Sequence, residues 1–166
     1  MKILAFDQST RVSGWSVFED EKYVDSGVID LSKIKDTTER TNQMGLAIGA
    51  LIADVKPDMI VIEETQCQSN VDTVKKLSRI QGMAMGFAAA LGIPVHILEP
   101  SKWRATLNFH QGPKVERKEL KKQSLDYVKE HFGFEDFSED RCEAIGINVA
   151  AQKIFGWASK MFHTTK

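Results

Sequence analysis

The chain is poor in cysteine, in proline and in charge of one sign, and each scarcity excludes a class of protein. Only two of its 166 residues are cysteines, Cys67 and Cys142, and their spacing fits neither a zinc site nor a disulfide framework. No apolar run approaches about 18 residues and no secretory signal is present, so we expect a soluble, intracellular protein without disulfides. Because the sequence has no Pro/Gly-rich linker and no internal repeat, we expect one domain over residues 1–166.

Charged residues are abundant but balanced. The chain has 22 Lys and Arg residues against 23 Asp and Glu residues, which gives a formal net charge of −1. This balance excludes a uniformly basic surface, so any site for a polyanion must be a local patch.

The first ten residues, Met1 to Thr10, are typical of a short apolar strand that ends in a single carboxylate, Asp7. An acid at the end of a buried strand must be paired, protonated or bound to a metal ion. Taken alone, Asp7 would more often be a turn or cap residue.

The next segments predict an antiparallel meander followed by a helix. After a loop over residues 8–13, apolar strands are expected around Trp15 to Phe18 and from Tyr23 to Ile29. Asp36 and Glu39 have the spacing of a capping box, and apolar residues then recur at helical spacing until Pro57.

A second short apolar strand, Met59 to Ile62, also ends in acid, at Glu63 and Glu64. Because a helix separates it from the meander, it is expected to pair in parallel with the first strand. Asp7 and one of these glutamates would then meet at the same sheet edge. Alternation favours Glu63, on the face of Val61, and leaves open whether Glu64 contributes.

A helix over Asn70–Leu91, capped by Asn70, is amphipathic in its first half and apolar on every face from Gly82 onward. Two explanations cover such a segment: contact with a second copy of the chain, which we favour, or burial in the core. A further strand is expected from Val95 to Leu98.

The chain turns basic from Ser101 to Lys129, which supplies the local patch. The alternative is a solvated helix face with alternating charges. The candidate DNA-binding residues, including three from the preceding helix, are Lys75, Lys76, Arg79, Lys102, Arg104, Lys114, Arg117, Lys118, Lys121 and Lys122. In the loop over residues 108–113, Phe109 is expected to pack in the ordinary way, with insertion between bases as the alternative. His110 is likewise expected to be an ordinary loop residue, with a phosphate or proton contact as the alternative.

Ser138 is expected to cap a last helix that runs to about Phe162. Asp140 and Glu143 continue the apolar stripe of this helix, so both acids should point toward the sheet. First-turn acids that complement the helix dipole are the alternative, and this explains Asp140 better than Glu143.

Four carboxylates therefore converge in the expected fold: Asp7, Glu63, Asp140 and Glu143. Clustered anions need protons or cations between them, and oxygen ligands without His or Cys select Mg²⁺ or Mn²⁺. Two such ions about 4 Å apart catalyse in-line displacement at phosphorus.

These residues also carry a family resemblance, which extends over almost the whole chain. The chain resembles RuvC-type Holliday junction resolvases of the ribonuclease-H-like superfamily. The matching segments are Ile3 to Thr10 with Gly14, Pro57 to Glu63, residues 70–82 with Lys76, Leu77 and Gly82, and Asp140 to Ala144.

The resemblance implies an α/β fold with a mixed five-stranded sheet and helices on both faces. The first three strands would form the antiparallel meander and the last two would run parallel to the first. It also implies a homodimer that nicks four-way DNA junctions with two Mg²⁺ ions per site, leaving 5'-phosphate and 3'-hydroxyl ends in a bacterial or phage-infected cytoplasm. Asp7, Glu63, Asp140 and Glu143 would bind metal, and the basic residues important for cleavage would fall on Arg104 and Lys121, with Lys102 and Lys122 near in register.

Two departures from the family pattern bear on specificity. Glu143 stands where bacterial members have Asp, and Gln66 stands where they carry an aromatic residue for the junction centre. A divergent, phage-type member with relaxed sequence preference is therefore expected.

Other functions fit the sequence less well. The loop after Asp7 is similar to the first phosphate loop of sugar kinases and actin-like ATPases, but those need two such domains. Proofreading exonucleases carry acid-x-acid on the first strand, whereas residue 9 is Ser, and hybrid ribonucleases place their glutamate on the first helix. A catalytically inactive dimer that binds branched DNA is the non-enzymatic alternative.

Overall fold

The computed structural model describes the backbone of residues 1–65 and 71–162, and side chains up to residue 156. A five-stranded sheet in the order β3-β2-β1-β4-β5 forms its centre. Its strands are β1 (Lys2–Asp7), β2 (Val12–Glu19), β3 (Lys22–Asp30), β4 (Met59–Glu63) and β5 (Val95–Leu98). β1 to β3 form an antiparallel meander, while β4 pairs in parallel with β1 and β5 with β4. The predicted sheet is confirmed.

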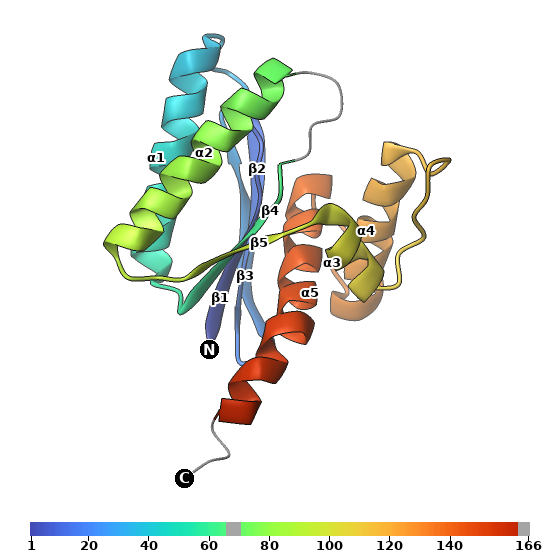
Figure 1. Cartoon of the computed structure of the whole chain (residues 1–166). Coiled ribbons are helices and arrows are strands. Elements are labelled where there is room, and N and C mark those ends of the chain that lie inside the picture. The colour runs from blue at the N-terminus through green and yellow to red at the C-terminus, as the bar shows by residue number, and fades with distance from the viewer. Residues whose placement is uncertain (66–70, 163–166) are drawn as a thin grey trace.

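Helices cover both faces of the sheet (Figure 1). On one face lie α1 (Thr37–Val55) and α2 (Val71–Ala90). On the other lies α5 (Glu139–Phe162), flanked by α3 (Pro100–Thr106) and α4 (Arg117–Phe132). Strand alternation explains the two cores. Leu4, Phe6 and the even-numbered residues of β4 face α1 and α2, whereas Ile3, Ala5 and the odd-numbered ones face α5 and α3.

Two glycines let α1 and α2 pack closely. A Cβ atom on Gly45 would lie 2.2 Å from the side chain of Met83, and one on Gly49 would lie 2.5 Å from the ring of Phe87. α1 begins as predicted, because the side chain of Asp36 accepts a hydrogen bond from the backbone N–H of Glu39.

Buried polar contacts fix α5 on the other face. The side-chain amide of Asn148 donates to the backbone carbonyls of Ile3 and Ser16, each at 3.0 Å. The hydroxyl of Ser16 in turn donates to the carbonyl of Ala144 at 2.8 Å. These hydrogen bonds set the position of α5 along β1 and β2, and therefore the height at which its first turn meets the sheet edge.

The first strand ends at Asp7, as predicted, but the second begins earlier than expected. β2 starts at Val12, inside the loop expected over residues 8–13. α2 is described from Val71 to Ala90, which agrees with the expected Asn70–Leu91 to within one residue. Its expected cap, Asn70, lies outside the described residues. Core burial, the alternative for the apolar half from Gly82 onward, is only partial, because Ala84 and Ala88 are the buried residues in this part of the described helix. None of the described helices is long and apolar enough to cross a membrane.

Candidate metal centre and nucleic-acid cleft

Two parallel strands end side by side in acid. Phe6 of β1 is in register with Ile62 of β4, so Asp7 and Glu63 follow at equivalent positions on the same face. The side chain of Glu63 is 19% exposed and points to α3, whereas Glu64 is exposed. The alternation argument for Glu63 is confirmed.

The first turns of α5 bring two more acids to this edge. Carboxylate oxygens of Asp7, Asp140 and Glu143 lie within 4.8 Å of one another, a grouping of the kind that holds a metal ion. Glu143 is nearly buried, with 6% of its surface exposed. Glu63 is not part of this group of three, but it lies near enough for its charge to raise the pKa of Asp7.

The electrostatics of the site are those of crowded and partly buried anions. Desolvation raises the pKa of Asp7 well above its usual range, and the charges of Glu143, Glu63 and Asp140 raise it further. Burial also raises the pKa of Glu63, against the opposing effects of a hydrogen bond from Trp103 and the charges of Arg104 and Arg117. A divalent cation would remove this repulsion, and the all-oxygen donor set suits a hard ion.

Two cations sit against the acids. The Nη2 of Arg104, on α3, donates to Oε1 of Glu143 at 3.2 Å and lies 3.5 Å from Oε1 of Glu63. The ammonium of Lys121, on α4, lies 3.3 Å from Asp140 and 3.8 Å from Glu143. Although desolvation lowers the pKa of Lys121, the surrounding acids raise it overall, so this side chain is charged.

A cleft of about 500 Å³ opens over the acids, between the start of α2 and the start of α4. Its lining includes the acids Asp7, Glu63 and Glu143. Its remaining lining residues are Gln8, Glu64, Thr73, Val74, Leu77, Pro100, Arg104, Val115, Arg117 and Leu120. Its volume is within the range of ligand sites in proteins, and acidic, basic and apolar side chains all contribute to its lining.

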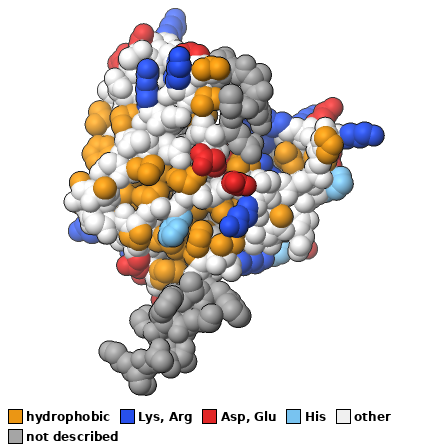
Figure 2. All heavy atoms as spheres, viewed as in Figure 1, with side chains coloured by type: hydrophobic (Ala, Val, Ile, Leu, Met, Phe, Trp, Pro, Cys, Tyr) orange, Lys and Arg blue, Asp and Glu red, His pale blue; other side chains and the backbone are white. Residues whose placement is uncertain are grey.

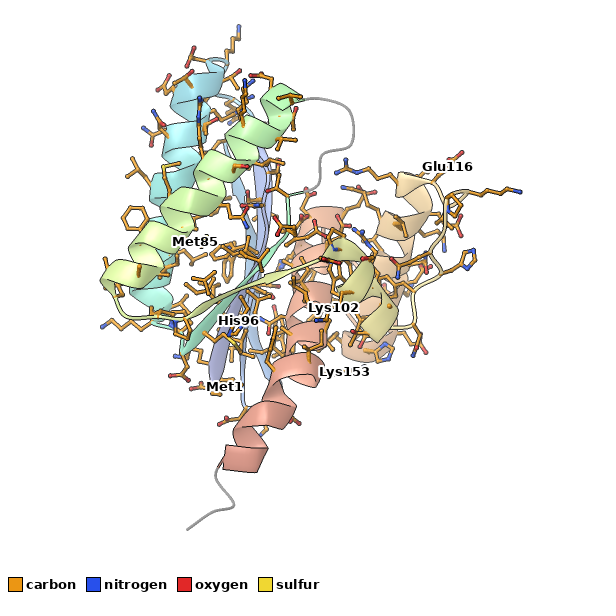
Figure 3. The ribbon with its side chains drawn as sticks, in the orientation of Figure 1. Met1, Met85, His96, Lys102, Glu116 and Lys153 are labelled. Carbon is orange, nitrogen blue, oxygen red and sulfur yellow. The ribbon has the colours of Figure 1, made fainter. Side chains whose placement is uncertain are left out.

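The ten candidate basic residues differ in their distance from the acids. Lys121, Arg104 and Arg117 lie at the site. Lys122 pairs with Asp126 and therefore differs from its neighbour Lys121. Lys102, labelled in Figure 3, is exposed on α3 and therefore differs from Arg104. The others lie on or next to α2 and α4, exposed except for the half-buried Lys76, which pairs with Asp72: Lys75, Lys76, Arg79, Lys114 and Lys118.

The loop that follows α3 does not present an aromatic wedge. Phe109 is half-buried and packs edge-on between Trp103 and Tyr127, with ring centroids 5.6 and 5.8 Å away. His110 is exposed, and its backbone N–H donates to Gln123. Gln66 and Cys67 lie outside the described residues.

Sequence reasoning missed two side chains at the site. The indole N–H of Trp103 donates to Oε1 of Glu63 at 2.7 Å. Gln8 lies in the cleft, and its amide donates to the hydroxyl of Thr65 at 2.9 Å, which donates to Gln81 of α2. The sequence carried no signal for either, because each contact joins segments far apart in the chain.

Comparison with known proteins gives one consistent result. A family model described as "Crossover junction endodeoxyribonuclease RuvC" matches residues 3–124. The curated RuvC of Geotalea uraniireducens is 30% identical over 99 residues, 57% of this chain and 58% of the relative. That of Citrifermentans bemidjiense is 28% identical over 100 residues, 58% and 61% of the two chains. The matches thus span about three fifths of the length of these relatives.

Solved structures share the fold over nearly the whole chain. Thermus thermophilus RuvC in complex with a Holliday junction substrate superimposes with a TM-score of 0.75 at 15% identity, covering 95% of this chain and 96% of that one. The yeast mitochondrial Holliday junction resolvase Ydc2 gives a TM-score of 0.60 at 15% identity, covering 98% and 80%.

Proposed function

The chain belongs to the family of the crossover junction endodeoxyribonuclease RuvC, and we propose that it is a metal-dependent endonuclease that resolves four-way DNA junctions. The observation that carries the proposal is the meeting of Asp7, Asp140 and Glu143 within 4.8 Å, beside Glu63 and at the base of an open cleft. Relatives that are named as crossover junction endodeoxyribonucleases support the choice of substrate.

The acids are proposed to hold two Mg²⁺ ions, for which Mn²⁺ would substitute. Asp7, Glu63 and Asp140 would supply oxygen ligands for these ions, and Glu143 would bind or position a metal. Bound there, the ions supply an activated water and stabilise the leaving oxygen of a phosphodiester. The fit rests on the oxygen donors and on the raised pKa of Asp7, whose cost a divalent cation would relieve.

The cations at the site have separate tasks in this proposal. Arg104 and Lys121 hold the carboxylates in place through ion pairs of 3.2 to 3.8 Å and lie where a phosphate over the acids would need positive charge. Arg117 would contact the DNA backbone from the cleft wall. The exposed basic residues along α2 and α4 would extend this contact along the DNA backbone.

A homodimer through α2 is the second part of the proposal. Figure 2 shows hydrophobic side chains gathered on the left of the view, where α2 lies in Figure 1. Met85, Phe87 and Leu91 are 45%, 37% and 54% exposed, an unusual number of large apolar side chains for one short segment. Because α2 also lines the cleft, its two-fold pairing would place two sites on one junction, as symmetric cutting requires.

The test is cleavage of a synthetic four-way junction. With Mg²⁺, the protein should make paired nicks in two strands of like polarity, leaving 5'-phosphate and 3'-hydroxyl ends, with little dependence on sequence. Asp7→Asn, Glu63→Gln and Asp140→Asn should still bind the junction but lose at least about a hundredfold in rate. Asp30→Asn, at an exposed acid on β3, is the control and should cut normally.

Two results would contradict the proposal. Unimpaired nicking by one of the three acid variants would remove that residue from the mechanism. Tight junction binding with no Mg²⁺- or Mn²⁺-dependent nicking by the unmutated protein would instead favour the inactive branched-DNA-binding dimer.

A further inference from the structure

Trp103 is a fully buried residue whose polar atom is engaged at the candidate site. It lies on α3, has no exposed surface, and donates its indole N–H to Oε1 of Glu63 across 2.7 Å. A buried indole needs an acceptor. Here that acceptor is the carboxylate at the end of β4, which the proposed function makes a metal ligand.

The indole ring is held from several sides. Phe109 packs against it edge-on at 70°, and the guanidinium of Arg104 lies 4.6 Å over its face. Gly146 of α5 faces the ring so closely that a Cβ atom there would lie 3.1 Å from it. The ring therefore cannot turn without moving α3 against α5, and its N–H direction is fixed by the core.

Both of the strongest contacts of Glu63 use one oxygen. Oε1 accepts the hydrogen bond from Trp103, and the same atom lies 3.5 Å from Arg104. Arg104 in turn donates to Glu143, so the two glutamates share one cation. With Oε1 engaged in this way, the second oxygen, Oε2, is the one placed to bind a cation.

We propose that Trp103 is a positioning residue that orients Glu63 for metal binding through Oε2 alone. The proposal rests on the proposed function, because it assumes that Glu63 is a metal ligand. Partners of this kind, which hold a ligand without touching the metal, typically contribute 10- to 100-fold to metal affinity. Trp103 thus joins the hydrophobic core between α3 and α5 to the acidic site.

The test separates this role from ordinary core packing. Trp103→Phe keeps an aromatic ring in the core but removes the N–H, and Mn²⁺ affinity is measured by calorimetric titration without DNA. We expect Mn²⁺ binding to weaken about 10- to 100-fold in Trp103→Phe. In a Glu63→Gln background the same change should have no further effect, because the group through which it acts is gone.

The matched control is Trp15→Phe, which alters a tryptophan of β2 on the opposite face of the sheet. It should destabilise the fold without changing Mn²⁺ affinity. If Trp103 serves packing only, Trp103→Phe will behave like this control, or its effect will be equal in both backgrounds. Either result overturns the proposal.

A second measurement does not depend on the folding of Trp103→Phe. The protein has three tryptophans, so ¹⁵N-labelled indole gives three N–H resonances, which Trp15→Phe and Trp157→Phe assign by elimination. The Trp103 resonance should lie downfield and move upfield in Glu63→Gln. A resonance that Glu63→Gln leaves unmoved would overturn the proposal.

The failures of the two proposals are distinguishable. If the unmutated protein binds no Mn²⁺, or if Glu63→Gln binds it normally, the metal site as proposed is wrong and the role of Trp103 is overturned with it. If Glu63→Gln weakens binding while Trp103→Phe does not, only the positioning role is lost.

Discussion

A Cβ atom on Gly14 would lie 1.9 Å from the backbone carbonyl oxygen of Asp140. Only glycine fits at this position, because the atom in the way belongs to the backbone of Asp140 and cannot rotate away as a side chain could. Gly14 is paired with Asp7 across β1 and β2, so the same position sets the distance between the strand-end acid and the start of α5. The meeting of the acids thus depends on a residue that carries no side chain.

Gly14→Ala should therefore damage the site more than a glycine substitution usually does. The start of α5 must shift, which separates Asp140 from Asp7, and we expect junction cleavage to fall at least about a hundredfold because catalytic groups tolerate little misplacement. Gly156→Ala, where a Cβ atom would meet no described residue within 4 Å, is the control and should cut normally. Cleavage rates of the two variants check this, and normal cutting by Gly14→Ala would contradict it.

The crowding of acids should destabilise the metal-free protein at neutral pH. Because the pKa of Asp7 is raised on folding, its cost is absent below the pKa of the unfolded chain and grows as the pH rises through the folded pKa. In EDTA at pH 7–8, Asp7→Asn should raise the free energy of unfolding by about 0.5–2 kcal/mol, the usual range of stabilising substitutions. The gain should shrink as the pH falls and vanish near pH 3, below the ordinary aspartate pKa of 3.8, where Asp7 is protonated in both states.

Urea unfolding across this pH range is the measurement. Asp30→Asn serves as the control, because hydrogen bonds from Ser32 lower the pKa of this exposed acid, and its removal should give no gain. If Asp7→Asn is less stable than the unmutated protein at pH 7–8, the Asp7 carboxylate is stabilised by its surroundings without a cation, which would contradict this expectation.

Lys121 and Lys122 are neighbours in the chain but should differ in function. Lys121 lies among Glu139, Asp140 and Glu143, whereas Lys122 pairs with Asp126 and is 71% exposed. Lys121→Met should reduce the cleavage rate about a hundredfold. If Lys121 also touches phosphate, the salt dependence of junction binding should lose about one unit of slope.

Lys122→Met is the matched variant and should cut within a fewfold of the unmutated rate. Single-turnover rates and binding at several salt concentrations distinguish the two. Equal loss in both variants would mean that general positive charge, and not the placement of Lys121, supports cleavage.

The exposed apolar face of α2 gives the fourth expectation. Met85→Glu would place a charge in the proposed subunit contact, and dimer affinity should fall at least about tenfold. Val24→Glu, at a 51% exposed residue of β3, is the control and should leave the oligomeric state unchanged. Sedimentation velocity measures this, and a Met85→Glu protein that still dimerises would place the contact elsewhere.

The sequence predicted the sheet, its strand pairing and the direction of Glu63, because short apolar segments, helical spacing and alternation are local patterns. It predicted the inward direction of Glu143 for the same reason. It did not predict Trp103 or Gln8 at the site, or the steric role of Gly14, since these depend on how α3, α5 and β2 pack. Which of the adjacent residues Lys121 and Lys122 faces the acids depends on how α4 packs, and the sequence alone does not show this.

Burial of α2 shows a different limit. Its apolar second half indicated that the helix is covered, but composition does not say by what. In the folded chain α1 covers one side, through Gly45 and Gly49, and leaves Met85 exposed. The other side is where the proposed dimer forms.

The most direct test of the account is anomalous X-ray scattering from crystals soaked in Mn²⁺. We expect two peaks about 4 Å apart, one on each side of Asp7 and within coordination distance of Glu63, Asp140 and Glu143. No peak at these carboxylates, in crystals that take up Mn²⁺ elsewhere, would contradict the metal site and with it the proposed nuclease mechanism.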